Sequence, residues 1–204
     1  MSAKKVRVAV LVSGGGTNLQ AIIDAQRSGV IKSGEVVLVI SNRQDAYALK
    51  RAGSAGIKTA VITKQDCGEN FENRLISVLR ENGIELIVLA GFMVILSKSF
   101  TDTFKNRIIN VHPSLIPSFC GEGFYGLRVH EAALEKGVKV TGATVHFVNE
   151  IPDGGEIIEQ KAVRVYPGDT PERLQKRVMR QAEWKILPKA IEIISERIKT
   201  NERL

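Results

Sequence analysis

The chain of 204 residues (22.4 kDa) has the length of one ordinary domain, enough to bury an apolar core. Hydrophobic residues make up 44% and charged residues 25%, which excludes a disordered or fibrous chain. The longest apolar run, residues 86–96, is about half of the roughly 20 residues that a membrane helix needs. Two cysteines without a C-x-x-C spacing and only three histidines favour neither a disulfide framework nor a metal site. We therefore expect a soluble, cytoplasmic protein with no metal and no membrane partner.

The net charge of +7 and the pI near 9.5 make nucleic acid a candidate partner. However, the densest group of positive residues, within residues 173–189, is interleaved with acidic ones, and no nucleic-acid-binding motif accompanies it. We therefore predict a small anionic substrate, which positive potential attracts, and no nucleic-acid partner.

The first half of the chain alternates strand and helix patterns with short connections. Strands are expected at residues 6–12, 35–40, 58–62 and 86–89, and helices at 18–26, 46–55 and 71–81. Repeated β-α-β units predict an α/β fold with a doubly wound, mostly parallel sheet, in which ligands bind beyond the carboxyl ends of the strands.

The second half has a different pattern. A short strand at residues 108–110 stops before Pro113, and a glycine-rich loop leads to a helix near residues 129–136. Residues 141–148 and 157–165 are β-rich and flank a tight turn, which predicts an antiparallel addition to the sheet. A C-terminal helical region begins at Pro171. With no repeat and no linker, we predict one domain.

Ser13-Gly14-Gly15-Gly16-Thr17-Asn18 stands where the first strand meets the first helix. Free backbone N–H groups and the helix dipole favour an anion there, so we predict a phosphate or ribose-phosphate site. The alternative is a bare tight turn, because neither the dinucleotide fingerprint nor the P-loop is complete.

Asn110 and His112 are two residues apart on a strand, so their side chains project to the same side. A carboxamide and an imidazole at the carboxyl end of a strand can bind a developing oxyanion. A polar strand end without catalytic function is the alternative when this pair is taken alone.

Six motifs resemble, in the same order, those of the phosphoribosylglycinamide formyltransferase family of purine biosynthesis, and they cover nearly the full chain. They are SGGGTNLQAI (13–22), ISNR (40–43), LAGFM (89–93), NVHPSLIP (110–117), TGATVHFV (141–148) and DGG (153–155).

This resemblance implies a Rossmann-like formyltransferase domain over residues 1–204, with phosphoribosyl binding in its N-terminal half and folate binding and catalysis in its C-terminal half. It implies direct transfer of the formyl group of 10-formyltetrahydrofolate, a co-substrate, to the amine of phosphoribosylglycinamide through a tetrahedral intermediate, on the route to IMP and without a metal. Asn110 and a protonated His112 would stabilise the formyl oxygen. Asp153 would raise the pKa of His112, support its imidazolium and help to relay the proton.

The resemblance also implies binding residues. The phosphoribosyl substrate would contact Gly16, Thr17, Asn18 and Glu183, the last of these through the substrate amine. Arg180, three residues before Glu183 on one helix face, would reach the phosphate, and a solvated charge is the alternative. The folate would contact Met93, Val94, Ile95, Leu96 and Asn110. Because Val94 replaces an arginine of some members, only apolar and backbone contacts are expected there.

The chain departs from the family pattern at two places. The loop at residues 119–126 is longer than in several members, so Cys120 and Tyr125 receive no role. No arginine near residues 68–70 matches the family's contact to the folate tail. His146 is interpreted as a structural strand residue, with a direct catalytic role as the alternative, and His130 as a surface residue.

Three rivals remain. Formyltetrahydrofolate deformylase resembles chains with an additional N-terminal regulatory domain, and methionyl-tRNA formyltransferase resembles chains with an additional C-terminal barrel. We expect neither additional domain in this protein. A regulatory nucleotide-binding module would keep the glycine loop but would not need Asn110, His112 and Asp153. The oligomeric state stays open.

Overall fold

The computed structural model describes residues 4–201. Its strands are β1 (Val6–Val12), β2 (Gly34–Ser41), β3 (Lys58–Val61), β4 (Leu86–Leu89), β5 (Ile108–His112), β6 (Val140–Phe147) and β7 (Ile157–Arg164). Its helices are α1 (Thr17–Arg27), α2 (Tyr47–Ser54), α3 (Lys64–Cys67), α4 (Phe71–Glu81), α5 (Lys98–Thr103), α6 (Leu127–Glu135), α7 (Pro171–Val178) and α8 (Trp184–Thr200). A 3-10 turn, η1 (Gly68–Asn70), precedes α4, and a π-helical segment, η2 (Met179–Glu183), joins α7 to α8.

The strands form one seven-stranded sheet in the order β3-β2-β1-β4-β5-β6-β7. The first five strands are parallel, whereas β6 and β7 pair antiparallel, as the sequence predicts. The chain runs outward from β1 through β2 to β3 and then continues at β4 on the other side of β1. The connections that follow β1 and β4 therefore run in opposite directions along the sheet. Between them a crevice opens at the carboxyl ends of these two strands.

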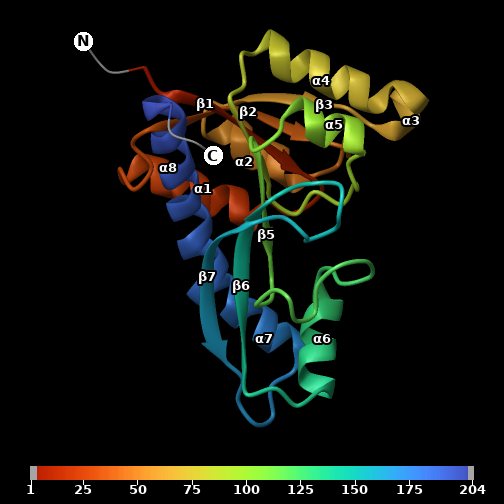
Figure 1. The fold of residues 1–204 in the computed structure, drawn as a ribbon, viewed down its shortest axis with the longest axis vertical. Helices are drawn as coiled ribbons and strands as arrows, with labels where there is room; N and C mark the ends of the chain where they lie inside the picture. The colour runs from red at the N-terminus through yellow and green to blue at the C-terminus, as the bar shows by residue number, and fades with distance from the viewer. Residues whose placement is uncertain (1–3, 202–204) are drawn as a thin grey trace.

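Side chains of β1 alternate between two apolar cores. Val8, Val10 and Val12 pack on the face that α1 and α8 cover, whereas Ala9 and Leu11 pack on the face of α4 and α5. Figure 1 shows α1 and α8 side by side on one side of the sheet and α4 and α5 on the other. Burial on both faces explains why β1 and β4 are nearly continuous apolar runs.

The structure confirms the fold class and differs from the expected elements at a few points. Helix α5 was not predicted; it begins after Ser97, whose hydroxyl accepts the Phe100 N–H. Strand β5 extends two residues beyond the expected end, up to His112. Within residues 4–201, no helix is both long and apolar enough to cross a membrane.

Candidate active site

The glycine loop between β1 and α1 presents its backbone N–H groups outward. Gly16 has φ +70, and a Cβ there would lie 2.6 Å from that of Ala48, so only glycine fits this close approach to α2. The Gly14 carbonyl accepts from the Ala48 N–H at 3.0 Å, and the Gly16 carbonyl from Gln20 at 2.9 Å. In contrast, the N–H groups of residues 14–18 donate no hydrogen bond within the described part of the chain. This arrangement supports an anion site, as predicted.

The loop after β4 lies against the glycine loop at the crevice. Ser13 donates its N–H to the Gly91 carbonyl at 3.1 Å, and its hydroxyl accepts from the Met93 N–H at 2.8 Å. Further along this loop, Val94, Ile95 and Leu96 line a pocket of about 130 Å³ together with Asn110, His146 and Asp153. Three residues of the expected folate segment therefore share one pocket with Asn110 and Asp153, whereas neither His112 nor the exposed Met93 lines it.

Asn110 and His112 lie among the last three residues of β5. The pairing of β5 with β6 determines their neighbours. The antiparallel register sets Asn110 opposite His146 and His112 opposite Thr144. The Asn110 Nδ2 atom lies 3.2 Å from His146 Nε2. His112 is only 4% exposed, and its Nε2 atom lies 2.8 Å from the Phe119 carbonyl, which fixes a proton on Nε2 because a carbonyl only accepts.

Asp153 reaches these histidines from the tight turn between β6 and β7. Its φ of +55 lies in the left-handed region that aspartate tolerates. Gly155 is required close by, because a Cβ there would overlap the Phe147 carbonyl oxygen. The Asp153 carboxylate lies 3.3 Å from His112 Nδ1 and 3.5 Å from His146 Nε2, and it accepts the Gly121 N–H at 2.9 Å. Asn110, His112 and Asp153 are thus brought together.

The protonation of this cluster depends on two opposing effects. Burial lowers the pKa of His112 below its ordinary value, although the Asp153 charge and the Phe119 carbonyl act in the opposite direction. Asp153 therefore raises this pKa, as expected, but burial has the larger effect and was not foreseen. Burial would raise the pKa of Asp153, but the hydrogen bond to His146 and the charge of His112 hold that pKa below its ordinary value.

His146 is a buried strand residue of β6, as interpreted from the sequence, whereas His130 is placed differently from its interpretation. His146 Nδ1 donates to the Phe147 carbonyl at 2.7 Å, so Nε2 is the atom that faces Asn110 and Asp153. This second imidazole therefore belongs to the site. His130, expected at the surface, is fully buried on α6, and burial lowers its pKa to about 4.

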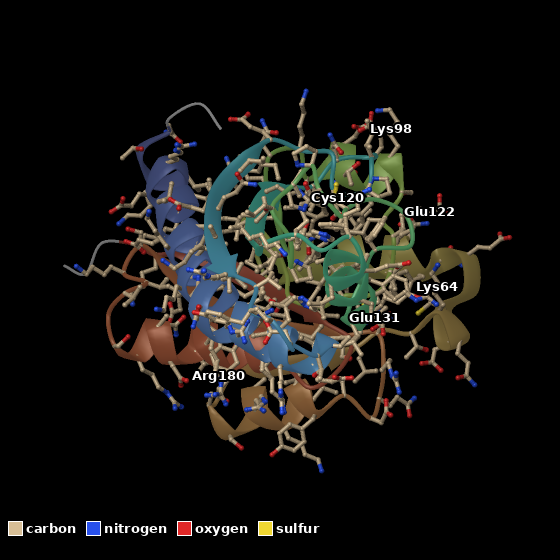
Figure 2. The ribbon with its side chains drawn as sticks, turned by 90° about the horizontal axis from the view of Figure 1, so that it is seen from below. Lys64, Lys98, Cys120, Glu122, Glu131 and Arg180 are labelled. Carbon is tan, nitrogen blue, oxygen red and sulfur yellow. The ribbon has the colours of Figure 1, made fainter. Side chains whose placement is uncertain are left out.

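Glu183 is buried beside the start of α1, where the glycine loop ends. Its carboxylate accepts from Asn18 Nδ2 at 2.7 Å, which joins the start of α1 to the end of η2. Burial raises the pKa of Glu183 to about 7, although the Asn18 hydrogen bond opposes the shift. Arg180 is exposed on η2 (Figure 2). The sequence predicts that Arg180 and Glu183 share one face of an α-helix. Both residues lie instead in the π-helical segment η2, where α-helical spacing does not apply.

Replacing Glu183 by glutamine should change how stability depends on pH. Because the folded state raises this pKa, wild type binds an extra proton near neutral pH and loses stability as the pH rises through about 7. Relative to Glu183→Gln, its free energy of unfolding should fall by about 3 kcal/mol between about pH 4 and pH 8. Urea denaturation at several pH values measures this change. Glu196→Gln, at an exposed position of α8, is the matched control, and a pH-independent difference for Glu183→Gln would contradict the assignment.

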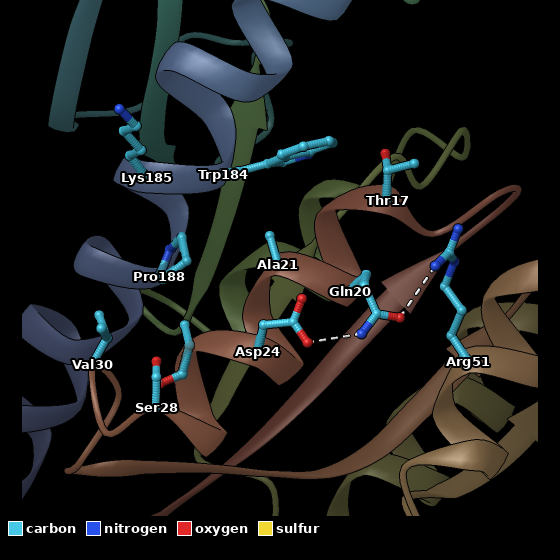
Figure 3. Close-up of a pocket in the computed structure, with 11 residues that line it drawn as sticks. Thr17, Gln20, Ala21, Asp24, Ser28, Val30, Arg51, Trp184, Lys185 and Pro188 are labelled. Carbon is cyan, nitrogen blue, oxygen red and sulfur yellow. Dashed lines mark hydrogen bonds between the residues drawn. The ribbon is translucent and has the colours of Figure 1, made fainter.

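A larger cavity of about 660 Å³ lies beside the glycine loop, between α1 and the start of α8. Thr17, Ala21, Trp184 and Pro188 line it, with Arg51 from α2 at one end (Figure 3). Thr17 is the only residue of the expected substrate set among its lining residues. Among residues 4–201, no group of three or more histidine, cysteine, aspartate or glutamate side chains is arranged to hold a metal ion.

Comparisons with known proteins relate the whole chain to one family and one fold. A family model described as formyl transferase matches residues 6–191. The chain is 42% identical over 200 residues to phosphoribosylglycinamide formyltransferase of Haemophilus influenzae, covering 96% of this chain and 91% of that protein. It is 45% identical over 197 residues to the trifunctional purine biosynthetic protein adenosine-3 of Gallus gallus, covering 96% of this chain but only 19% of that protein. The crystal structure of glycinamide ribonucleotide transformylase 1 from Symbiobacterium toebii matches with a TM-score of 0.87 and 44% identity, over 94% of this chain and 88% of that chain.

A doubly wound sheet with a polar cluster at the carboxyl end of one of its parallel strands is typical of an α/β enzyme. The chain belongs to the formyl transferase family, which confirms the resemblance seen in the motifs.

Proposed function

We propose that the protein transfers the formyl group of 10-formyltetrahydrofolate to the amine of phosphoribosylglycinamide, giving the N-formyl product. The observation that carries this proposal is the meeting of Asn110, His112 and Asp153 beside the apolar segment after β4, since the start of that connection contacts the glycine loop. A phosphorylated amine and a formyl donor would meet over these three side chains. The names of the Haemophilus influenzae and Symbiobacterium toebii proteins support the same reaction.

Each substrate has a matching surface. The phosphate would bind at the free N–H groups of Gly16, Thr17 and Asn18. Glu183, whose buried carboxylate accepts from Asn18 of this loop, would accept from the amine of the substrate. Arg180 would contact the phosphate, because its exposed guanidinium has no ion-pair partner within residues 4–201.

The folate would lie along residues 93–96. Leu96 is buried, whereas Met93 and Ile95 expose 56% and 72% of their surface, so apolar side chains are available to a flat heterocycle. Val94 carries no charge and offers only apolar and backbone contacts. The two binding regions thus come from the connections after β1 and β4, with Glu183 added from the C-terminal half.

The reaction requires stabilisation of an oxyanion. As the amine nitrogen attacks the formyl carbon, the carbonyl electrons move to oxygen and a tetrahedral intermediate forms. Asn110 Nδ2 would donate to this oxygen, and its contact with His146 Nε2 at 3.2 Å would hold the carboxamide in place. His112 Nε2–H, which the Phe119 carbonyl accepts in this structure, would turn to the oxyanion as the stronger acceptor.

Collapse of the intermediate breaks the bond between the formyl carbon and the folate nitrogen. The proton lost by the amine must reach that nitrogen. Asp153, beside both histidines, would pass it on through water and would increase the imidazolium fraction of His112 against the effect of burial. No covalent enzyme intermediate is required.

A carbon-13 label in the formyl group tests the proposal. With both substrates present, we expect the label in the N-formyl ribonucleotide, detected by mass spectrometry, and none in formate. Recovery of the label in formate would instead indicate a deformylase, and the absence of turnover with bound nucleotide would indicate a regulatory module.

A further inference from the structure

The carbonyl groups of the glycine loop are held from one side by α2. Gly14 accepts from the Ala48 N–H at 3.0 Å, and Gly15 accepts from the Arg51 Nε–H at 2.9 Å. The first contact is made by the backbone, and the second depends on a single side chain. Neither Gly14 nor Gly15 has an atom within 4 Å of the position where a Cβ would stand. Their own packing therefore does little to restrict the two peptide planes.

Peptide planarity converts these contacts into an orientation of the N–H groups. In a trans peptide the carbonyl of one residue and the N–H of the next lie in one plane and point in opposite directions. The Ala48 contact thus fixes the direction of the Gly15 N–H, and the Arg51 contact fixes that of the Gly16 N–H. Both N–H groups point away from α2 and are without a partner in residues 4–201.

Arg51 is itself held in place. Its NH1 group donates to Gln20 Oε1 at 3.1 Å, and Gln20 in turn donates to Asp24 at 2.9 Å along α1 (Figure 3). The guanidinium also lies 5.0 Å from the centre of the Tyr47 ring, within the range of a cation–π contact. A planar guanidinium with several donors in fixed directions suits this double contact better than an ammonium does.

We propose that Arg51 is a positioning residue for the phosphate cradle: it holds the Gly15 carbonyl against α2, so that the Gly16 N–H faces the bound phosphate. This inference rests on the proposed function, since it assigns a phosphate monoester to the loop. Arg51 acts through the Gly15–Gly16 peptide and not through contact with the ligand.

Arg51→Met removes the donors and keeps much of the side-chain length. Lys50→Met is the matched control, because it removes the same charge from the preceding position of α2. Within residues 4–201, the Lys50 ammonium makes no ion pair and lies 5.9 Å from the centre of the Tyr47 ring. Arg51→Lys keeps the charge and one possible donor. For each variant we would measure the Kd of ribose 5-phosphate, the KM for phosphoribosylglycinamide, kcat, and the Gly16 amide signal and its hydrogen exchange in ligand-free protein.

Arg51→Met should raise the Kd of ribose 5-phosphate and the KM for the ribonucleotide about tenfold, the effect of one lost hydrogen bond of ordinary strength to a charged group. The kcat value should change less than about twofold, since the reacting atoms are untouched. Without ligand, the Gly16 amide should shift and exchange faster. Arg51→Lys should restore part of the affinity, and Lys50→Met should resemble wild type.

Equal effects of Arg51→Met and Lys50→Met would overturn the inference, because long-range charge would then explain both. Weaker binding with an unchanged Gly16 amide would also overturn it, in favour of direct contact between Arg51 and phosphate. The amide signal and ribose 5-phosphate binding do not depend on formyl transfer. They therefore test Arg51 even where the proposed reaction fails, and a wild-type protein that does not bind ribose 5-phosphate would refute the cradle.

Discussion

Asn110→Ala should lower turnover about 10²–10³-fold, because it removes one preorganised donor to the developing oxyanion. The Asn110 carboxamide is held 3.2 Å from His146, so little reorganisation is needed when the intermediate forms. Binding of both substrates should persist, since the glycine loop and the apolar segment lie on other connections. Steady-state kinetics with both substrates saturating measures the loss.

The isosteric variant Asn110→Asp is the control for shape. It keeps the size of the side chain but has no N–H group, so its turnover should be at least as low as that of the alanine variant. Retention of more than about a third of wild-type turnover in Asn110→Ala would rule out Asn110 as the donor.

Asp153→Asn should move the basic limb of the pH–rate profile to lower pH and reduce turnover at neutral pH. The Asp153 carboxylate, 3.3 Å from His112 Nδ1, raises the pKa of His112 and so offsets part of the effect of burial. Without that charge the pKa of His112 falls further, and the imidazolium is lost at a lower pH. Turnover measured against pH, with both substrates saturating, reports this shift.

Asp102→Asn provides the charge control, because Asp102 is exposed on α5 and, among the residues that the structure describes, forms an ion pair only with Lys98. Its profile should coincide with that of wild type. A profile of Asp153→Asn that also coincides with wild type, at a nearly normal rate, would remove Asp153 from the mechanism.

The regular parts of this fold could be predicted because their signals are local. The apolar run of β1, the glycines that follow it and the Asn110-x-His112 spacing are each contained in a few consecutive residues. Helix α5 escaped prediction because it is short and polar, with Phe100 as its one large apolar side chain and Ser97 as its cap. The π-helical segment before Glu183 likewise has no local signature in the sequence.

The remaining features of the site depend on tertiary contacts. His146 faces Asn110 because of the register between β5 and β6, which no single strand encodes. His130 is buried because other elements cover that side of α6. The pKa of His112 falls because burial outweighs the neighbouring carboxylate, a balance that the sequence does not reveal.

The central claim is that the formyl group passes to the amine of the ribonucleotide and not to water. The most direct test is the rate at which 10-formyltetrahydrofolate loses its formyl group, with and without phosphoribosylglycinamide. We expect loss only when the ribonucleotide is present, with one N-formyl product formed for each folate consumed. An equal rate of loss without the ribonucleotide would contradict the account.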